Sequence, residues 1–139
     1  MRKFFRLSED KRPRRYVREN NEYTVRPKTK KELLDIIEQT IEEQGNNADL
    51  NFIDTSMIND MSELFFDYTN FNGDISNWNT SSVKLMKYMF YGSKFNGDIS
   101  EWDVSNVENM FAMFAYSNFN GDISNWDVSN VKYMNWMFL

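Results

Sequence analysis

Aspartate residues recur at a fixed interval in this sequence, and carboxylates are the side chains with the clearest chemical potential. Asp74, Asp98 and Asp122 occupy the same position of three successive copies of a repeated phrase, and Asp49 holds the matching position of an earlier, worn copy. A column of like charges is unfavourable unless each carboxylate accepts hydrogen bonds or a cation lies between them. Calcium prefers about six to eight oxygen ligands, whereas each repeat offers one Asp and one Asn. We therefore expect these aspartates to cap turns, with calcium binding as the weaker alternative.

A second set of polar residues occupies the alternate positions of segments that we predict to be short strands. Alternation places such residues on the exposed face of a strand. An exposed acidic face on a repeat protein suits a basic or hydroxyl-rich protein partner, so we predict a partner-binding surface here. The alternative is that these side chains satisfy backbone N–H groups at turns and helix starts. The predicted surface comprises Asp54, Asn77, Asn79, Glu101, Asp103, Asn125 and Asp127.

The sequence contains no histidine and no cysteine. Their absence excludes disulfides, thiol nucleophiles, zinc fingers and any catalytic triad that needs an imidazole base. Acid–base catalysis by two carboxylates needs two contrasting environments, which a regular repeat does not supply. We therefore expect no enzymatic activity, no catalytic residues and no cofactor.

One phrase occurs three times and predicts the architecture of most of the chain. It reads FNGDISNWNTSSV from Phe71, FNGDISEWDVSNV from Phe95 and FNGDISNWDVSNV from Phe119, and a worn copy starts at Ala48. A fixed period of about 20 to 50 residues indicates repeat units that bury their apolar faces against one another. We expect a solenoid over 47–139, with units 47–70, 71–94, 95–118 and 119–139.

Comparison of the copies predicts a strand and a short helix in each unit. Ile99, Trp102 and Val104 have the L-x-x-L-x-L spacing of a leucine-rich repeat, whose second half alternates as a strand does. The apolar positions 107, 110, 113 and 114 then switch to the period of three to four that is typical of a helix. The predicted fold class is therefore α/β, a leucine-rich-repeat-like solenoid. Its strands are expected near 51–55, 76–80, 100–104 and 124–128.

The region before the repeats predicts a helix and a hairpin. Thr29 and Glu32 have the spacing of a capping box, apolar residues follow at helical intervals, and Gly45 provides a stop. We expect a helix from about 30 to 44 that caps the first repeat, within a unit spanning 29–46. A β-hairpin over 15–26 is expected in the arm formed by residues 1–28, because Asn20 and Asn21 accept turn dihedrals.

Positive charge is concentrated in the arm. Residues 1–31 hold 12 Lys and Arg against 4 Asp and Glu, a net charge of +8, and the remainder of the chain has a net charge of −13. This segment is compatible with three roles. It can dock on the acidic body, residues 32–139, of its own or a sister chain, it can bind nucleic acid, or it can simply be solvated. Nucleic acid is the less favoured partner. The basic side chains concerned are Lys11, Arg12, Arg14, Arg15 and Arg18.

Aromatic residues at variable repeat positions indicate a second surface. Tyr88, Phe111, Tyr133 and Trp136 are predicted on the helical side of the repeats, where an exposed cluster would mark protein contact. The sequence as written stops at Phe138 and Leu139 without a polar capping unit for the last coil. Either two molecules meet there, or the sequence is truncated, or Leu139 and its neighbours cap the coil, and we favour a homo-oligomer. The sequence as written contains neither a signal peptide nor an apolar run of membrane-spanning length, so we expect no membrane span. As written it is typical of a cytoplasmic protein, but the sequence does not determine the compartment.

The repeated phrase FNGDIS-x-WDVSNV-x-x-M-x-x-MF resembles the BspA-like leucine-rich-repeat family, whose members include many bacterial surface proteins and lipoproteins. The resemblance covers about 27–139. It implies an α/β solenoid used for adhesion or protein binding, often at the cell surface, and it implies no catalytic residues.

These observations together predict a non-enzymatic protein-binding module that recognises its partner through the acidic strand face. A structural component that assembles by docking its basic arm on an acidic neighbour is the alternative. A nucleic-acid binder led by the arm is a third and less favoured function.

Overall fold

The computed structural model describes residues 23–139, and its only α-helix over that range is α2, Lys30–Gln44. The Thr29 side chain caps the helix by accepting a hydrogen bond from the Glu32 backbone N–H at 3.1 Å, and the Glu32 carboxylate accepts from the Lys28 N–H at 2.8 Å. Gly45, at a φ of 87°, donates its N–H to Ile41 and ends the helix. Glycine suits this position because it adopts positive φ without a Cβ clash. The predicted helix is confirmed.

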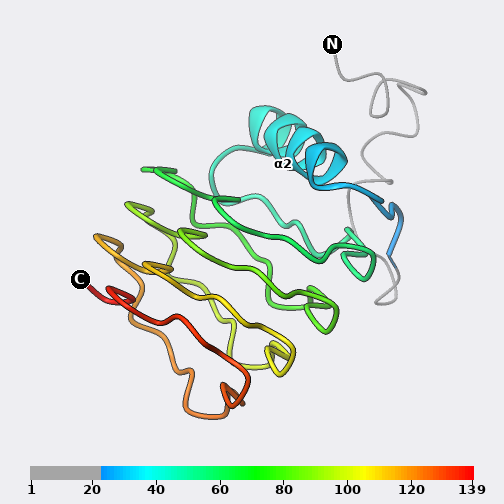
Figure 1. Cartoon of the computed structure of the whole chain (residues 1–139). Coiled ribbons are helices and arrows are strands. Elements are labelled where there is room, and N and C mark those ends of the chain that lie inside the picture. The colour runs from blue at the N-terminus through cyan, green and yellow to red at the C-terminus, as the bar shows by residue number, and fades with distance from the viewer. Residues whose placement is uncertain (1–22) are drawn as a thin grey trace.

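Helix α2 covers one end of a stack of coils, and the chain then winds away from it towards the C-terminus at the other end (Figure 1). Its apolar side chains Leu33, Ile36 and Ile37 are buried and join the same core as the repeats. The polar residue Thr40 is also buried, and its hydroxyl donates to the Ile36 carbonyl at 2.7 Å. A helix with one apolar face thus closes the first coil from solvent.

The predicted α/β leucine-rich-repeat solenoid, with one strand and one short helix per unit, is wrong. Over residues 23–139 the repeats contain tight turns and isolated parallel bridges, without strands and without helices after α2. Successive copies nevertheless lie side by side, because most of these bridges join equivalent positions of neighbouring copies. The bridges are Val25 with Ile53, Asp49 with Asp74, Asp60 with Leu85, Leu85 with Asn109, and Asn109 with Tyr133.

The segment 83–92, for which the periodicity predicts a helix, is a run of turns that pairs with the next coil. Met86 and Tyr88 donate their N–H groups to Asn109 and Phe111 of the following copy, each at 2.9 Å. Met89, which follows these donors, donates to the Met86 carbonyl within its own coil instead. Alternating donors of this kind are incompatible with a helix, in which each N–H bonds four residues back. Successive tight turns also bring every third side chain inward, so the apolar period alone does not separate the two structures.

The segments predicted as strands are joined to their neighbours mainly by side chains. The Trp102 indole N–H donates to the Ile75 carbonyl at 3.1 Å, and the Thr80 hydroxyl donates to the Asp103 carbonyl at 2.8 Å. Within the coil, the Trp78 N–H turns back to Ile75 at 3.2 Å. These bonds satisfy the backbone carbonyls that a strand ladder would otherwise use, and no sheet forms over the described range.

Stacked aromatic rings form the centre of the core. Phe65, Phe90, Phe114 and Phe138 follow one another with ring centroids 5.5 Å apart. A parallel column of Phe71, Phe95 and Phe119 has spacings of 6.3 Å. The apolar positions that are constant between copies are buried in the second and third copies, as predicted. Two of them are exposed in the last coil, where Met134 is 40% and Phe138 is 61% exposed.

The residues before α2 pair with the first copy of the repeat. Thr24 donates its N–H to the Phe52 carbonyl at 2.9 Å, and Asp54 donates its N–H to the Val25 carbonyl at 2.8 Å. Most of the predicted hairpin over 15–26 lies outside the described residues. The arm side chains Lys11, Arg12, Arg14, Arg15 and Arg18 also lie outside them.

Candidate functional site

Six of the seven residues predicted to bind a partner lie exposed at corresponding places of successive coils. We call this set the polar edge. Tight turns expose the side chains here, in place of the strand alternation used to predict them. The polar edge consists of Asn77, Asn79, Glu101, Asp103, Asn125 and Asp127.

The aspartates of the polar edge are held in place by the serine two residues later. Ser105 donates its backbone N–H at 3.0 Å and its hydroxyl at 2.6 Å to Oδ1 of Asp103. These hydrogen bonds lower the pKa of Asp103, and bonds from Ser129 likewise lower the pKa of Asp127. A hydrogen bond to the charged form favours that form. The edge therefore presents two carboxylates whose orientation is set before any partner arrives.

Asp54, the remaining predicted member, is buried to 8% exposure and is not part of the polar edge. Burial alone raises the pKa of its carboxyl, but hydrogen bonds from Ser56 and the nearby Arg26 guanidinium outweigh burial, and the net pKa is lowered. The Arg26 Nε lies 2.8 Å from Asp54 Oδ2. This ion pair joins the segment before α2 to the first repeat.

The aspartate column with the weak calcium assignment is exposed and caps turns. Asp74 and Asp98 each accept two hydrogen bonds, from the N–H and hydroxyl of Ser76 and Ser100 respectively, at 2.7–2.9 Å. These bonds lower the pKa of Asp98, although the charges of its neighbours in the column raise it in part. Asp122 accepts a bond from Ser124 in the same way. Among residues 23–139, no three acidic side chains converge as a metal site requires.

We predict that Ser105→Ala raises the pKa of Asp103, because the hydroxyl that stabilises the carboxylate is lost. Because the pKa of Asp103 is lower in the folded state than in the unfolded state, its ionised carboxylate stabilises the fold at neutral pH. That contribution is lost as the pH falls through the folded-state pKa. An NMR titration of the carboxyl carbons from about pH 6 to about pH 2 covers the ordinary Asp range and measures the shift.

The matched variant Ser129→Ala should shift Asp127 and leave Asp103 unchanged. Identical Asp103 titration curves in the wild type and in Ser105→Ala would contradict the role assigned to the hydroxyl.

Exposed and half-buried aromatic side chains form a continuous surface, which we call the aromatic face, on the successive turns that replace the predicted short helices. The predicted residues Tyr88, Phe111 and Trp136 belong to it, with centroid distances of 5.4 Å between Tyr88 and Phe111 and 5.6 Å between Phe111 and Trp136. Tyr133, also predicted, is 55% exposed and pairs with Asn109 of the preceding coil through a parallel bridge. The prediction missed three members, although their regular recurrence in the sequence is a detectable signal. These are Phe66, Tyr91 and Tyr116.

The aromatic face contains backbone strain. Tyr88, Tyr116 and Trp136 have φ angles between 56° and 60°, which is uncommon for a bulky residue. The surrounding structure must hold such a conformation, and here the N–H groups of Tyr88 and Tyr116 are tied to the next coil at 2.9 and 3.0 Å. The rings are therefore displayed by a constrained backbone.

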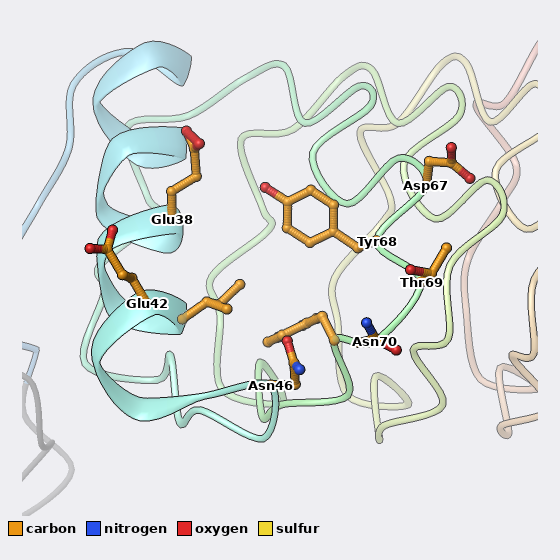
Figure 2. Close-up of a pocket in the computed structure, with 9 residues that line it drawn as sticks. Glu38, Glu42, Asn46, Asp67, Tyr68, Thr69 and Asn70 are labelled. Atoms are coloured by element: carbon orange, nitrogen blue, oxygen red, sulfur yellow. The ribbon is translucent and has the colours of Figure 1, made fainter.

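An open pocket of about 460 Å³ lies between α2 and the loop 67–71. Figure 2 shows Glu38 and Glu42 on the helix side, with the Tyr68 ring between them and Asp67. Three carboxylates around an open space create a negative potential that attracts a basic side chain. The pocket is one place where the acidic body could receive a cationic segment.

The described part of the chain is thus a repeat protein of stacked, turn-rich coils that displays a polar edge and an aromatic face. The chain belongs to the family described as "Mycoplasma protein of unknown function, DUF285", which matches residues 35–139. That range includes most of α2 and all four copies of the repeat. No curated protein and no solved structure matches the chain. Within residues 23–139, no helix has the length and apolar character needed to cross a membrane.

Proposed function

We propose that this protein is a non-enzymatic protein-binding module, of the kind that the BspA-like resemblance implies, and that the polar edge recognises a basic partner. The observation that carries the proposal is the pair of exposed carboxylates, Asp103 and Asp127, held by serine hydrogen bonds at the same place in two successive coils. Groups that are already oriented lose less conformational entropy on binding, which raises affinity. Complementary charge also speeds the encounter with a basic partner.

The aromatic face supports the same function as a second contact surface. Tyrosine and tryptophan contribute disproportionately to binding energy at protein interfaces. Trp136 is 63% exposed and Tyr116 is 62% exposed, so both rings have area available for burial by a partner. The charges would give specificity and the rings would give affinity.

A pull-down with the full chain tests the proposal. The double variant Asp103→Asn/Asp127→Asn removes two charges while keeping an oxygen that can accept from each serine. We expect the proteins retained by the wild type to be retained about two- to thirtyfold less by this variant, because each charged contact contributes about 0.2–1 kcal/mol at an exposed site. Retained proteins should be basic, and their retention should weaken at high salt.

The double variant Asp98→Asn/Asp122→Asn is the matched control. It makes the same change of charge in the neighbouring column and should keep binding. Equal loss in both double variants would show a general charge effect and would contradict recognition by the polar edge.

The alternative function is a self-assembling component whose basic arm docks on an acidic neighbour. The pocket between α2 and the loop 67–71 favours it, since Glu38, Glu42 and Asp67 line an open space of suitable charge. In this case the protein retained in the pull-down would be the chain itself, and the association would be lost only when bait and prey both begin at residue 23. Nucleic-acid binding by the arm stays a prediction.

A further inference from the structure

Asparagine side chains line an open groove of about 630 Å³ that runs across three successive coils. The groove is separate from the polar edge and from the aromatic face, and it uses two positions of each repeat. One position is Asn70, Lys94 or Asn118, and the other is Asn72, Asn96 or Asn120. All six side chains are exposed. We call this surface the asparagine groove.

Hydrogen bonds between coils determine how two of these amides are oriented. The Asn96 backbone N–H donates to Oδ1 of Asn72 at 2.8 Å, and the Asn120 backbone N–H donates to Oδ1 of Asn96 at 2.7 Å. The oxygen of each amide is therefore directed at the next coil. The NH₂ group of each is left as the group available to a ligand, because an Asn side chain carries one carbonyl and one NH₂.

At Asn72 and Asn96 the asparagine groove thus offers mainly hydrogen-bond donors. Lys94 adds three further N–H donors and a positive charge. A ligand that fits must be rich in acceptor oxygens and long enough to span successive coils. An extended peptide fits less well, since its backbone presents one N–H donor for each carbonyl and the amide oxygens of Asn72 and Asn96 already accept from the protein.

A polyanion also fits poorly because of the surrounding charge. Asp74, Asp98 and Asp122 are exposed two residues beyond the groove asparagines in each copy, and aspartate carboxylates are ionised at neutral pH. Lys94 is the one cation among the residues that line the groove. The three carboxylates outnumber the single ammonium, which disfavours a ligand of repeated negative charge.

We infer that the asparagine groove binds an extended, uncharged polysaccharide. Ring, glycosidic and hydroxyl oxygens of such a chain accept from the amide NH₂ groups, and its hydroxyls can donate to the nearby aspartates. The inference does not depend on the protein-binding function proposed above, because it concerns other residues and another class of ligand.

The variant Asn96→Asp tests this inference with little disturbance of the fold. The aspartate keeps an oxygen that accepts from the Asn120 N–H, but it replaces the NH₂ donor by an acceptor. We expect affinity for a neutral polysaccharide to fall about three- to tenfold, which corresponds to the loss of one net hydrogen bond. Affinity electrophoresis of the full chain through gels containing dextran, soluble starch or hydroxyethylcellulose measures the dissociation constant from the change in mobility.

The control variant Asn59→Asp adds the same charge at an exposed site outside the groove and should bind as the wild type does. Thermal unfolding of both variants verifies that they are folded. Wild-type protein that is retarded by none of the three polymers would overturn the inference, and so would equal retardation of the wild type and Asn96→Asp. A further gel contains the polyanion hyaluronan, and retardation in that gel alone, abolished by salt, would also overturn the inference and would identify a polyanion ligand instead.

Discussion

Replacing Phe90 by alanine is expected to lower the free energy of unfolding by about 3–5 kcal/mol, the usual cost of removing a buried phenylalanine ring. Phe90 is fully buried and stands at the middle of the aromatic core. Its ring stacks on Phe65 and Phe114 at 5.5 Å and on Phe95 at 4.7 Å. The residue joins three coils, so its loss leaves a cavity that no single coil can close. Urea unfolding followed by tryptophan fluorescence measures the change.

The matched variant is Phe138→Ala, which removes the same ring from the equivalent position of the last coil. Phe138 stacks on Phe114 at 5.5 Å, but it is 61% exposed. Its truncation should cost less than half as much, because the ring is only partly removed from water in the folded state. Equal costs for the two variants would contradict a core that is centred on the inner coils.

Replacing Gly73 by alanine is expected to cost about 2–3 kcal/mol, within the range for overpacking a buried site. A Cβ at this position would overlap the backbone carbonyl oxygen of Ala48 and the ring of Phe71. The carbonyl cannot move freely, because it accepts the Asp74 N–H at 3.0 Å where the first two coils pair. The requirement for glycine is therefore a matter of space. The same urea titration measures the loss.

The corresponding variant Gly121→Ala is the control. Its Cβ would meet the Phe119 ring at 2.7 Å, but the nearest backbone oxygen, that of Gly97, is 3.6 Å away. Phe119 is the last ring of its column, stacked on Phe95, so it can shift away from the added Cβ, and a cost of about 1 kcal/mol or less is expected. A larger loss in Gly121→Ala than in Gly73→Ala would show that backbone contact between coils does not decide the effect.

The sequence predicted which residues are buried better than it predicted the backbone that buries them. Constant positions such as Phe95 and Trp102 are in the core, as the comparison of copies implied. Helix α2 was also predictable, since Thr29, Glu32 and Gly45 carry local signals for its start and end. The short helix expected over 107–114 does not form. The sequence could not show this, because helices and successive turns share an apolar period of three to four.

The candidate surfaces were predicted unevenly for a related reason. Exposure of Asp103 and Asp127 followed from their place between core residues, whichever backbone connects them. The burial of Asp54 could not be foreseen, since it depends on Arg26, which is distant in sequence and adjacent only after the first coil forms. The asparagine groove was missed because its donors are defined by hydrogen bonds between coils.

The sequence by itself determined the repeat, its period, the residues that face inward and the helix that covers the first coil, because these depend on hydrophobicity and on local capping. Only the tertiary structure decided that the coils are built from turns whose N–H groups alternate between local and cross-coil acceptors. The N–H of Met86 bonds the next coil, whereas that of Met89 bonds its own coil. The cross-coil acceptors are distant in sequence and become neighbours only when the coils stack, with their aromatic rings 5.5 and 6.3 Å apart.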